Sequence, residues 1–284
     1  MTLRSGFVAL TGRPNVGKST LINKIVDEKV SITSDKAQTT RHEIRGVLNR
    51  ADAQVVVVDT PGVGKPRSAL GHSLNDTAFS AWSGVDVVCF VVDGRSGFGR
   101  GDAGLAERLS RVDPEKLVVV VNKIDGMAPE KVFAQLQAVS SIPAAAYFPV
   151  SAFTGKGVSA LVEHLVAAMP EGPRWYPEDV VRETPDPLWV AELVREQLLR
   201  VTHQEVPHSV ATRVTEWEWP RVRVEILVER ESQKGIVIGK GGSVLKDVGI
   251  KVRRQLPRGA FVELVVGVKS GWQHDRTAVE ELGY

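Results

Sequence analysis

Cysteine is nearly absent from the sequence, which has Cys89 alone among 284 residues. One cysteine excludes an intramolecular disulfide framework and is typical of a reducing compartment. The six histidines show no HExxH or Cys/His ligand spacing, so no zinc site is expected. Long apolar runs are also missing, because residues 85–92 and 117–121 fall far short of the roughly 18 residues that span a bilayer. Arg4 interrupts the apolar start that a signal peptide needs, so we expect neither export nor a membrane span.

Charge of one sign is lacking as well, since the formal net charge is only +2. A balanced total identifies no partner, although it can hide a local basic excess. The length and the 43% apolar content suffice for one or two full hydrophobic cores and exclude disorder of the whole chain. We therefore expect two domains.

The first 165 residues alternate short β-rich runs with helical stretches, which predicts βαβ units. The runs are apolar throughout, as strands covered by helices on both faces are. This predicts an α/β domain with a mostly parallel sheet and helices on both faces. The expected strands are Phe7–Leu10, Val55–Val58, Val87–Val92, Val118–Val121 and Tyr147–Val150.

Five prolines lie between residues 169 and 187, a stretch with few large aliphatic residues. This composition is typical of a linker. We predict a first domain at 1–170, a linker at 171–186 and a smaller α+β domain at 187–284. Its expected elements are a helix at Leu188–Val201, strands at Ser209–Trp217 and Arg221–Glu229, a glycine-rich turn, a basic helix at Ser243–Gln255 and a strand at Phe261–Val268.

A phosphate-binding loop follows the first predicted strand and leads into a predicted helix over Lys18–Asp27. The stretch GRPNVGKST matches G-x-x-x-x-G-K-[ST], in which backbone N–H groups close around phosphates at a helix N-terminus. Lys18 would neutralise the β- and γ-phosphates, and Ser19 would ligate Mg²⁺. The predicted nucleotide-binding residues here are Gly12, Arg13, Pro14, Asn15, Val16, Gly17, Lys18, Ser19 and Thr20.

The base is expected to be guanine because Asn122-Lys123-Ile124-Asp125 ends another predicted strand. The Asp125 carboxylate can accept from both the N1–H and the 2-amino group of guanine, and adenine offers no such pair of donors. Ser151-Ala152 follows the next strand and could supply a backbone N–H to guanine O6. We predict that Asn122, Lys123, Asp125, Ser151 and Ala152 bind the nucleotide.

Asp59-Thr60-Pro61-Gly62 follows a strand and fits the loop in which an Asp holds Mg²⁺ through water and a Gly N–H senses the γ-phosphate. A threonine of the preceding polar stretch is expected to ligate Mg²⁺ in the GTP state, with Thr40 favoured over Thr39. The predicted metal ligands are therefore Ser19, Thr40 and Asp59. The predicted catalytic residues are Asn15, Lys18, Thr40 and Gly62.

Position 63, where Ras-like switches place a glutamine that orients the attacking water, is valine. Valine cannot hydrogen-bond water, so we expect slow basal hydrolysis of GTP, roughly 10⁻⁴ to 10⁻² per second as in other unassisted switches. Asn15 resembles an asparagine that ligates a catalytic K⁺ in some GTPases. K⁺ is therefore a candidate cofactor beside GTP, GDP and Mg²⁺.

The second domain contains a GxxG turn, which alone is a weak signal in a glycine-rich chain. It joins two predicted helices after a β-hairpin, as in a type II KH domain, and residues 234–258 carry seven Lys/Arg and one acid. Such a basic turn suits the backbone of single-stranded RNA. The alternative is a solvated basic helix face. The predicted RNA clamp comprises Ile238, Gly239, Lys240, Gly241 and Gly242.

The chain resembles the Era family of bacterial GTPases in GRPNVGKST, SITSDKAQTTRH, DTPG, NKID, SA, VERESQKGIVIGKGG and KSGW. The resemblance spans nearly the whole chain. It implies a GTPase that binds 16S rRNA near its 3′ end and assists assembly of the 30S subunit. It also implies a cytoplasmic location with peripheral contact to an anionic membrane, and we expect a monomer.

Three alternatives remain open at the level of sequence. The first is a constitutive RNA-binding module with a purely structural nucleotide domain, which intact Lys18, Ser19 and Asp59 disfavour. The second is a GTPase of RNA modification or of the membrane whose second domain binds protein. The third is an ATP-using kinase, which the NKID motif disfavours.

Overall fold

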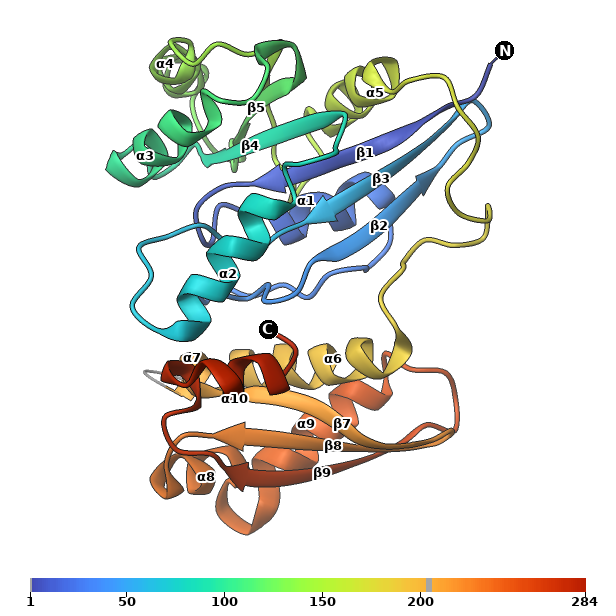
Figure 1. The fold of residues 1–284 in the computed structure, drawn as a ribbon. Helices are drawn as coiled ribbons and strands as arrows, with labels where there is room; N and C mark the ends of the chain where they lie inside the picture. Colours follow the sequence, from blue (N-terminus) through green and yellow to red (C-terminus); the bar gives the residue numbers. More distant parts are fainter. Residues whose placement is uncertain (1, 203–205) are drawn as a thin grey trace. The chain divides into compact units, whose positions relative to one another are not determined.

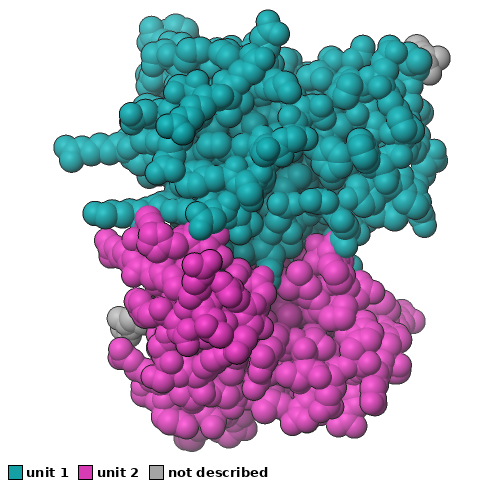
Figure 2. All heavy atoms as spheres, viewed as in Figure 1, with its two compact units in different colours: residues 1–31, 40–65, 74–183 teal, residues 32–39, 66–73, 184–284 magenta. Residues whose placement is uncertain are grey.

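The computed structural model describes residues 2–202 and 206–284. The chain divides into two compact units, shown in two colours in Figure 2. The first unit comprises residues 1–31, 40–65 and 74–183, and the second comprises residues 32–39, 66–73 and 184–284. Each unit has a sheet and a hydrophobic core of its own.

A six-stranded sheet in the order β2-β3-β1-β4-β5-β6 forms the first unit (Figure 1). Its pairs are parallel except the antiparallel β2–β3 pair at one edge, so the predicted α/β fold with a mostly parallel sheet is confirmed. The elements are β1 (Arg4–Thr11), α1 (Lys18–Val26), β2 (Ile44–Asn49), β3 (Ala53–Asp59), α2 (Ala69–Ser80), β4 (Val87–Asp93), α3 (Arg100–Leu109), β5 (Leu117–Asn122), α4 (Pro129–Val139), β6 (Ala146–Pro149) and α5 (Val158–Ala168), with a 3-10 turn at Pro114–Lys116.

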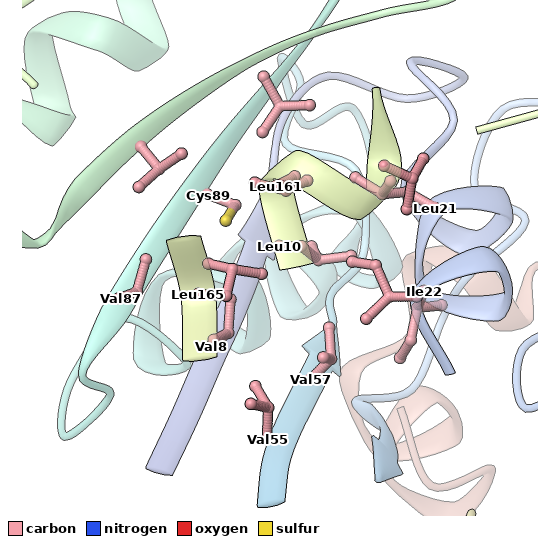
Figure 3. Packing of buried hydrophobic residues seen from close by; sticks show 14 of the residues in the cluster. Val8, Leu10, Leu21, Ile22, Val55, Val57, Val87, Cys89, Leu161 and Leu165 are labelled. Atoms are coloured by element: carbon pink, nitrogen blue, oxygen red, sulfur yellow. The ribbon is translucent and has the colours of Figure 1, made fainter. Parts of the chain in front are cut away.

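Both faces of this sheet are buried, because successive residues of a strand point to opposite faces. In β4, Cys89 packs into the cluster that contains α1 and α5, whereas Phe90 packs into the cluster that contains α3 and α4. Figure 3 shows the first cluster, in which Leu161 and Leu165 of α5 lie over β1, β3 and β4. Burial on both faces explains why these strands are continuous apolar runs.

The segment predicted as a linker is tied to the edge of this sheet. Val47 of β2 donates its N–H to the carbonyl of Val181 at 2.9 Å. The fully buried amide of Gln54 donates to the Tyr176 carbonyl at 2.8 Å and accepts from the Trp175 N–H at 2.7 Å. Most of this proline-rich segment therefore belongs to the first unit.

The second unit carries a three-stranded sheet in the order β7-β8-β9, with the β7–β8 pair antiparallel and the β8–β9 pair parallel. The alternating side chains of β8 are buried against α6, α8 and α9, as the period of two predicts. The predicted α-β-β-α-α-β order is confirmed, and short helices α7 and α10 are added. The elements are α6 (Asp186–Val201), α7 (Val206–Ser209), β7 (Ala211–Glu218), β8 (Arg221–Val228), α8 (Glu231–Ile238), α9 (Ser243–Arg253), β9 (Phe261–Val268) and α10 (Arg276–Glu281), with 3-10 turns at Lys240–Gly242 and Trp272–His274.

Candidate nucleotide site and basic turn

The phosphate loop connects β1 to α1 and depends on two glycines. A Cβ at Gly12 would lie 2.3 Å from the Val91 carbonyl oxygen, and one at Gly17 would lie 2.4 Å from Asn122 Nδ2. Gly17 also has φ +96°, in the left-handed region that favours glycine. The loop can therefore close only without side chains at these positions.

Lys18 begins α1 and is buried beneath the loop. Its ammonium donates to the carbonyls of Gly12 at 3.2 Å and Arg13 at 3.3 Å. Burial lowers the pKa of Lys18 to about 8, and the charge of Asp59 partly opposes that shift. A buried cation with only neutral acceptors gains from an arriving anion, which suits a phosphate group.

Side-chain hydroxyl groups converge around the Asp59 carboxylate at the end of β3. The Asp59 Oδ2 atom accepts from Ser31 Oγ at 2.9 Å and from Thr40 Oγ1 at 3.2 Å. The hydroxyls of Ser19 and Thr40 are 2.8 Å apart. Asp59 Oδ1 is buried without a hydrogen-bond partner, and burial raises the pKa of this carboxyl while Lys18 opposes the shift. A partnerless buried carboxylate oxygen beside two hydroxyls fits Mg²⁺, which prefers oxygen ligands.

The hydroxyl of Thr40, and not that of Thr39, lies beside Asp59 and Ser19. Thr39 Oγ1 turns away and donates to the Lys36 carbonyl at 2.7 Å. Within residues 2–202 and 206–284, no group of three or more His, Cys, Asp or Glu side chains could hold a metal ion. A bound Mg²⁺ would therefore take its ligands from hydroxyls, one carboxylate, phosphate and water.

The DTPG loop lies directly against the phosphate loop. Thr60 Oγ1 donates to the Leu10 carbonyl at 2.8 Å, and the Val63 N–H donates to the Gly12 carbonyl at 3.1 Å. A Cβ at Gly62 would meet the Pro14 Cα at 2.6 Å. This contact brings the main chain of Gly62 close to the phosphate loop.

Asn122 at the end of β5 links two loops of the site. Its Nδ2 donates to the Val16 carbonyl at 2.9 Å, and its Oδ1 accepts the Ala152 N–H at 2.9 Å. The Ser151 N–H donates to the Lys156 carbonyl at 2.8 Å. Both N–H groups of the predicted Ser151-Ala152 pair thus donate to acceptors within the protein. The Ser151 side chain instead donates to the Asp125 carboxylate.

Asp125 lies in a cavity of about 380 Å³, which Gly17, Thr20, Arg95, Asn122, Lys123, Ala152 and Phe153 also line. Ser151 Oγ donates to Asp125 Oδ1 at 2.8 Å, and this hydrogen bond lowers the pKa of the Asp125 carboxyl. The carboxylate is therefore ionised at neutral pH and ready to accept hydrogen bonds.

Lys123 connects this cavity to the phosphate loop. Its ammonium donates to the Asn15 carbonyl at 2.5 Å and to Asp93 Oδ2 at 2.7 Å. Asn15 and Lys123 both have left-handed backbones, with φ of 64° and 66°. Predicted nucleotide residues that follow three strands, β1, β5 and β6, therefore meet around one cavity.

Three residues of this site escaped the sequence prediction. Ser31 holds Asp59, Arg95 contacts Asp125, and Phe153 lines the cavity while 84% of its surface is exposed. An aromatic residue directly after Ser151-Ala152 was the one available signal, because stacking on a base needs an exposed ring.

The basic turn lies between α8 and α9 of the second unit. Gly239, Gly241 and Gly242 have φ of 74°, 60° and 77°, and a Cβ at Gly239 would lie 2.5 Å from Val244 Cγ2. Lys240 is exposed, as are Lys246, Arg253, Arg254 and Arg258. This surface therefore presents main-chain groups and cations together. None of the helices in the described parts of the chain is both long and apolar enough to cross a membrane.

Known proteins match both units. The family described as 50S ribosome-binding GTPase matches residues 7–123, and the KH domain family matches residues 205–273. GTPase Era of Leuconostoc citreum is 41% identical over 294 residues, covering 100% of this chain and 97% of that protein. GTPase Era of Mycobacterium tuberculosis is 44% identical over 296 residues, covering 99% of this chain and 98% of that protein.

Two solved structures are similar over their whole length. One is Era in complex with MgGDPNP and nucleotides 1506–1542 of 16S ribosomal RNA, with a TM-score of 0.94, 35% identity and 99% of each chain covered. The other is a single-residue variant of Aquifex aeolicus Era bound to GDP·AlF4⁻, with a TM-score of 0.94, 34% identity and 99% of each chain covered.

Proposed function

Since the chain belongs to the Era family of GTPases, we propose that its GTP and Mg²⁺ are held by the residues that meet at the ends of β1, β3 and β5. The observation that carries this assignment is the buried, partnerless Asp59 Oδ1 beside the Ser19 and Thr40 hydroxyls. Mg²⁺, when bound, neutralises phosphate charge, and Asp59, Ser19 and Thr40 would hold it there.

The phosphates would lie in the loop of residues 12–20, with the Lys18 ammonium leaving its carbonyl partners for them. Asp125 would accept from the N1–H and 2-amino groups of guanine. Titration calorimetry with GDP, ADP and no-Mg²⁺ controls tests this. We expect Mg²⁺-dependent binding of GDP and none of ADP, and equal affinity for ADP would overturn the base assignment.

Hydrolysis by this chain would proceed without a glutamine after Gly62. The Gly62 N–H would contact the γ-phosphate, and Lys18 would stabilise its developing charge. Val63 cannot orient water, so we propose slow basal turnover. Asn15, exposed on the phosphate loop, is the proposed ligand of a stimulating K⁺. Replacing K⁺ by Na⁺ should slow turnover, and unchanged turnover would remove K⁺ from the mechanism.

We propose that the second unit binds 16S rRNA near its 3′ end and that the protein assists assembly of the 30S subunit. The similar Era structure with nucleotides 1506–1542 of 16S rRNA supports this, as do the left-handed glycines and exposed cations of the turn. Backbone N–H groups and cations suit phosphates. Lys240→Glu should weaken binding of an RNA with that sequence, and Glu178→Lys, a charge change on the first unit, should not.

The nucleotide state is proposed to control RNA affinity through residues 32–39, which belong to the second unit. Buried Arg195 of α6 donates to the main-chain oxygens of Gln38 and Thr39, and Glu196 accepts the Thr33 N–H at 3.0 Å. Thr40, the next residue along the chain, is the proposed Mg²⁺ ligand. RNA affinity should therefore differ between a GTP analogue and GDP, and identical affinities would contradict the switch.

A monomer in the cytoplasm is the proposed working form, with peripheral contact to anionic lipid through the same exposed cations. Sedimentation of the protein with phosphatidylglycerol vesicles tests the lipid contact. Binding that Lys240→Glu weakens and high salt abolishes would support it, and no binding at low salt would contradict it.

A further inference from the structure

Arg95 is hydrogen-bonded to Asp125, the carboxylate that is proposed to bind the guanine base. It lies just after β4, and its Nη2 donates both to Asp125 Oδ2 and, at 3.0 Å, to the Asp125 carbonyl oxygen. The other carboxylate oxygen already accepts from Ser151. In this structure both oxygens of Asp125 are thus engaged by donors of the chain itself.

The guanidinium of Arg95 resembles the edge of guanine that Asp125 would bind. Both present planar N–H donors to a carboxylate. A guanine entering the cavity would donate to the Asp125 carboxylate, one oxygen of which Arg95 holds. Arg95 and the base therefore compete for one acceptor.

The structure also offers Arg95 a place to move. Arg95 and Asp125 line both the base cavity of about 380 Å³ and a neighbouring cavity of about 570 Å³. The second cavity includes Gln135, whose amide oxygen can accept from a guanidinium. Arg95 is 56% exposed, so the side chain can leave Asp125 without disturbing the core.

We infer that Arg95 is an internal competitor of the guanine base, which must displace it from Asp125 before the nucleotide is fully bound. This inference rests on the proposed nucleotide site. An ion pair this exposed contributes little free energy. At low salt it should reduce the fraction of molecules with a free Asp125 carboxylate by a factor of about two to five. The apparent affinity for nucleotide falls by the same factor.

Competition in the free state acts on entry and not on release. Arg95→Ala should therefore raise the association rate constant for GDP about two- to fivefold and leave the dissociation rate constant unchanged. The gain should shrink in 1 M NaCl, because salt weakens an ion pair that is as exposed as this one. Pyrophosphate, which needs only the phosphate loop, should bind both proteins equally.

Stopped-flow binding of a fluorescent GDP to wild type, Arg95→Ala and Arg111→Ala measures these rates. Arg111 is an exposed arginine just after α3 and serves as the matched control. Unchanged association, or faster dissociation from Arg95→Ala, would overturn the inference, and the latter would place Arg95 on the bound nucleotide. Failure of the wild type to bind GDP would instead refute the nucleotide site itself.

Discussion

The Asp102 carboxylate of α3 accepts a hydrogen bond from Arg13 Nε of the phosphate loop at 2.7 Å. Asp102 is fully buried and also accepts the Gly99 N–H at 3.0 Å, while 32% of the Arg13 side chain is exposed. The phosphate loop is therefore fixed by a residue nearly ninety positions away along the chain. The phosphate-loop motif does not include a residue so far away in the sequence.

Removing this carboxylate should destabilise the first unit. Asp102→Ala leaves Arg13 and the Gly99 N–H without their acceptor, and hydrogen bonds to charged groups contribute about 1.5–3 kcal/mol. We expect a loss of that size in the free energy of unfolding, measured by urea denaturation. Asp76→Ala changes an exposed acid of α2 and should stay within about 0.5 kcal/mol. Equal losses for the two variants would contradict the structural role of Asp102.

Asp125→Asn should change the base that the site prefers. The amide can still accept the N1–H, but its NH₂ group faces the 2-amino group of guanine and would instead suit the C2 oxygen of xanthine. A mispaired buried donor costs about 1–3 kcal/mol, so GDP affinity should fall about 5- to 150-fold relative to that of XDP. Competition against a fluorescent nucleotide measures both, and an unchanged preference for guanine would remove Asp125 from base recognition.

Gly239→Ala should weaken RNA binding and destabilise the second unit by about 1–2 kcal/mol, because its φ of 74° suits only glycine and Val244 fills the space of a Cβ. Gly235→Ala provides the matched control within α8, where no atom lies within 4 Å of an added Cβ. There alanine should raise stability by up to about 1 kcal/mol. Thermal unfolding and RNA titration of both variants measure these effects. Equal stability and equal RNA affinity of the two variants would contradict the assigned turn.

Cys89 should resist thiol reagents until the protein unfolds. Burial raises the pKa of its thiol to about 12, so about one molecule in a thousand would carry the reactive thiolate at pH 9. Reaction with Ellman's reagent should therefore be slow in buffer and immediate in 6 M guanidinium chloride. Rapid labelling of the native protein would contradict the packing of β4.

Local patterns predicted the features whose cause is local. The apolar strands and the alternation in β8 follow from burial. The spacing of Gly12 and Gly17 predicts the phosphate loop because the close packing of that loop requires glycine at both positions. Strand β2 was not predicted. Its antiparallel pairing with β3 at the edge of the sheet is a tertiary interaction that the local sequence pattern does not specify. Arg95 and Ser31 were missed because their partners, Asp125 and Asp59, lie about thirty residues away.

The attachment of residues 171–183 along β2 and β3 decides where the chain can be divided. A fragment ending at residue 170 would expose the Val47 N–H and leave the buried amide of Gln54 without Trp175 and Tyr176. Such a fragment would present a bare strand edge and would be prone to aggregate. A fragment that continues through Glu183 retains these hydrogen bonds, and only residues 32–39 and 66–73 then lose the second unit to which they belong.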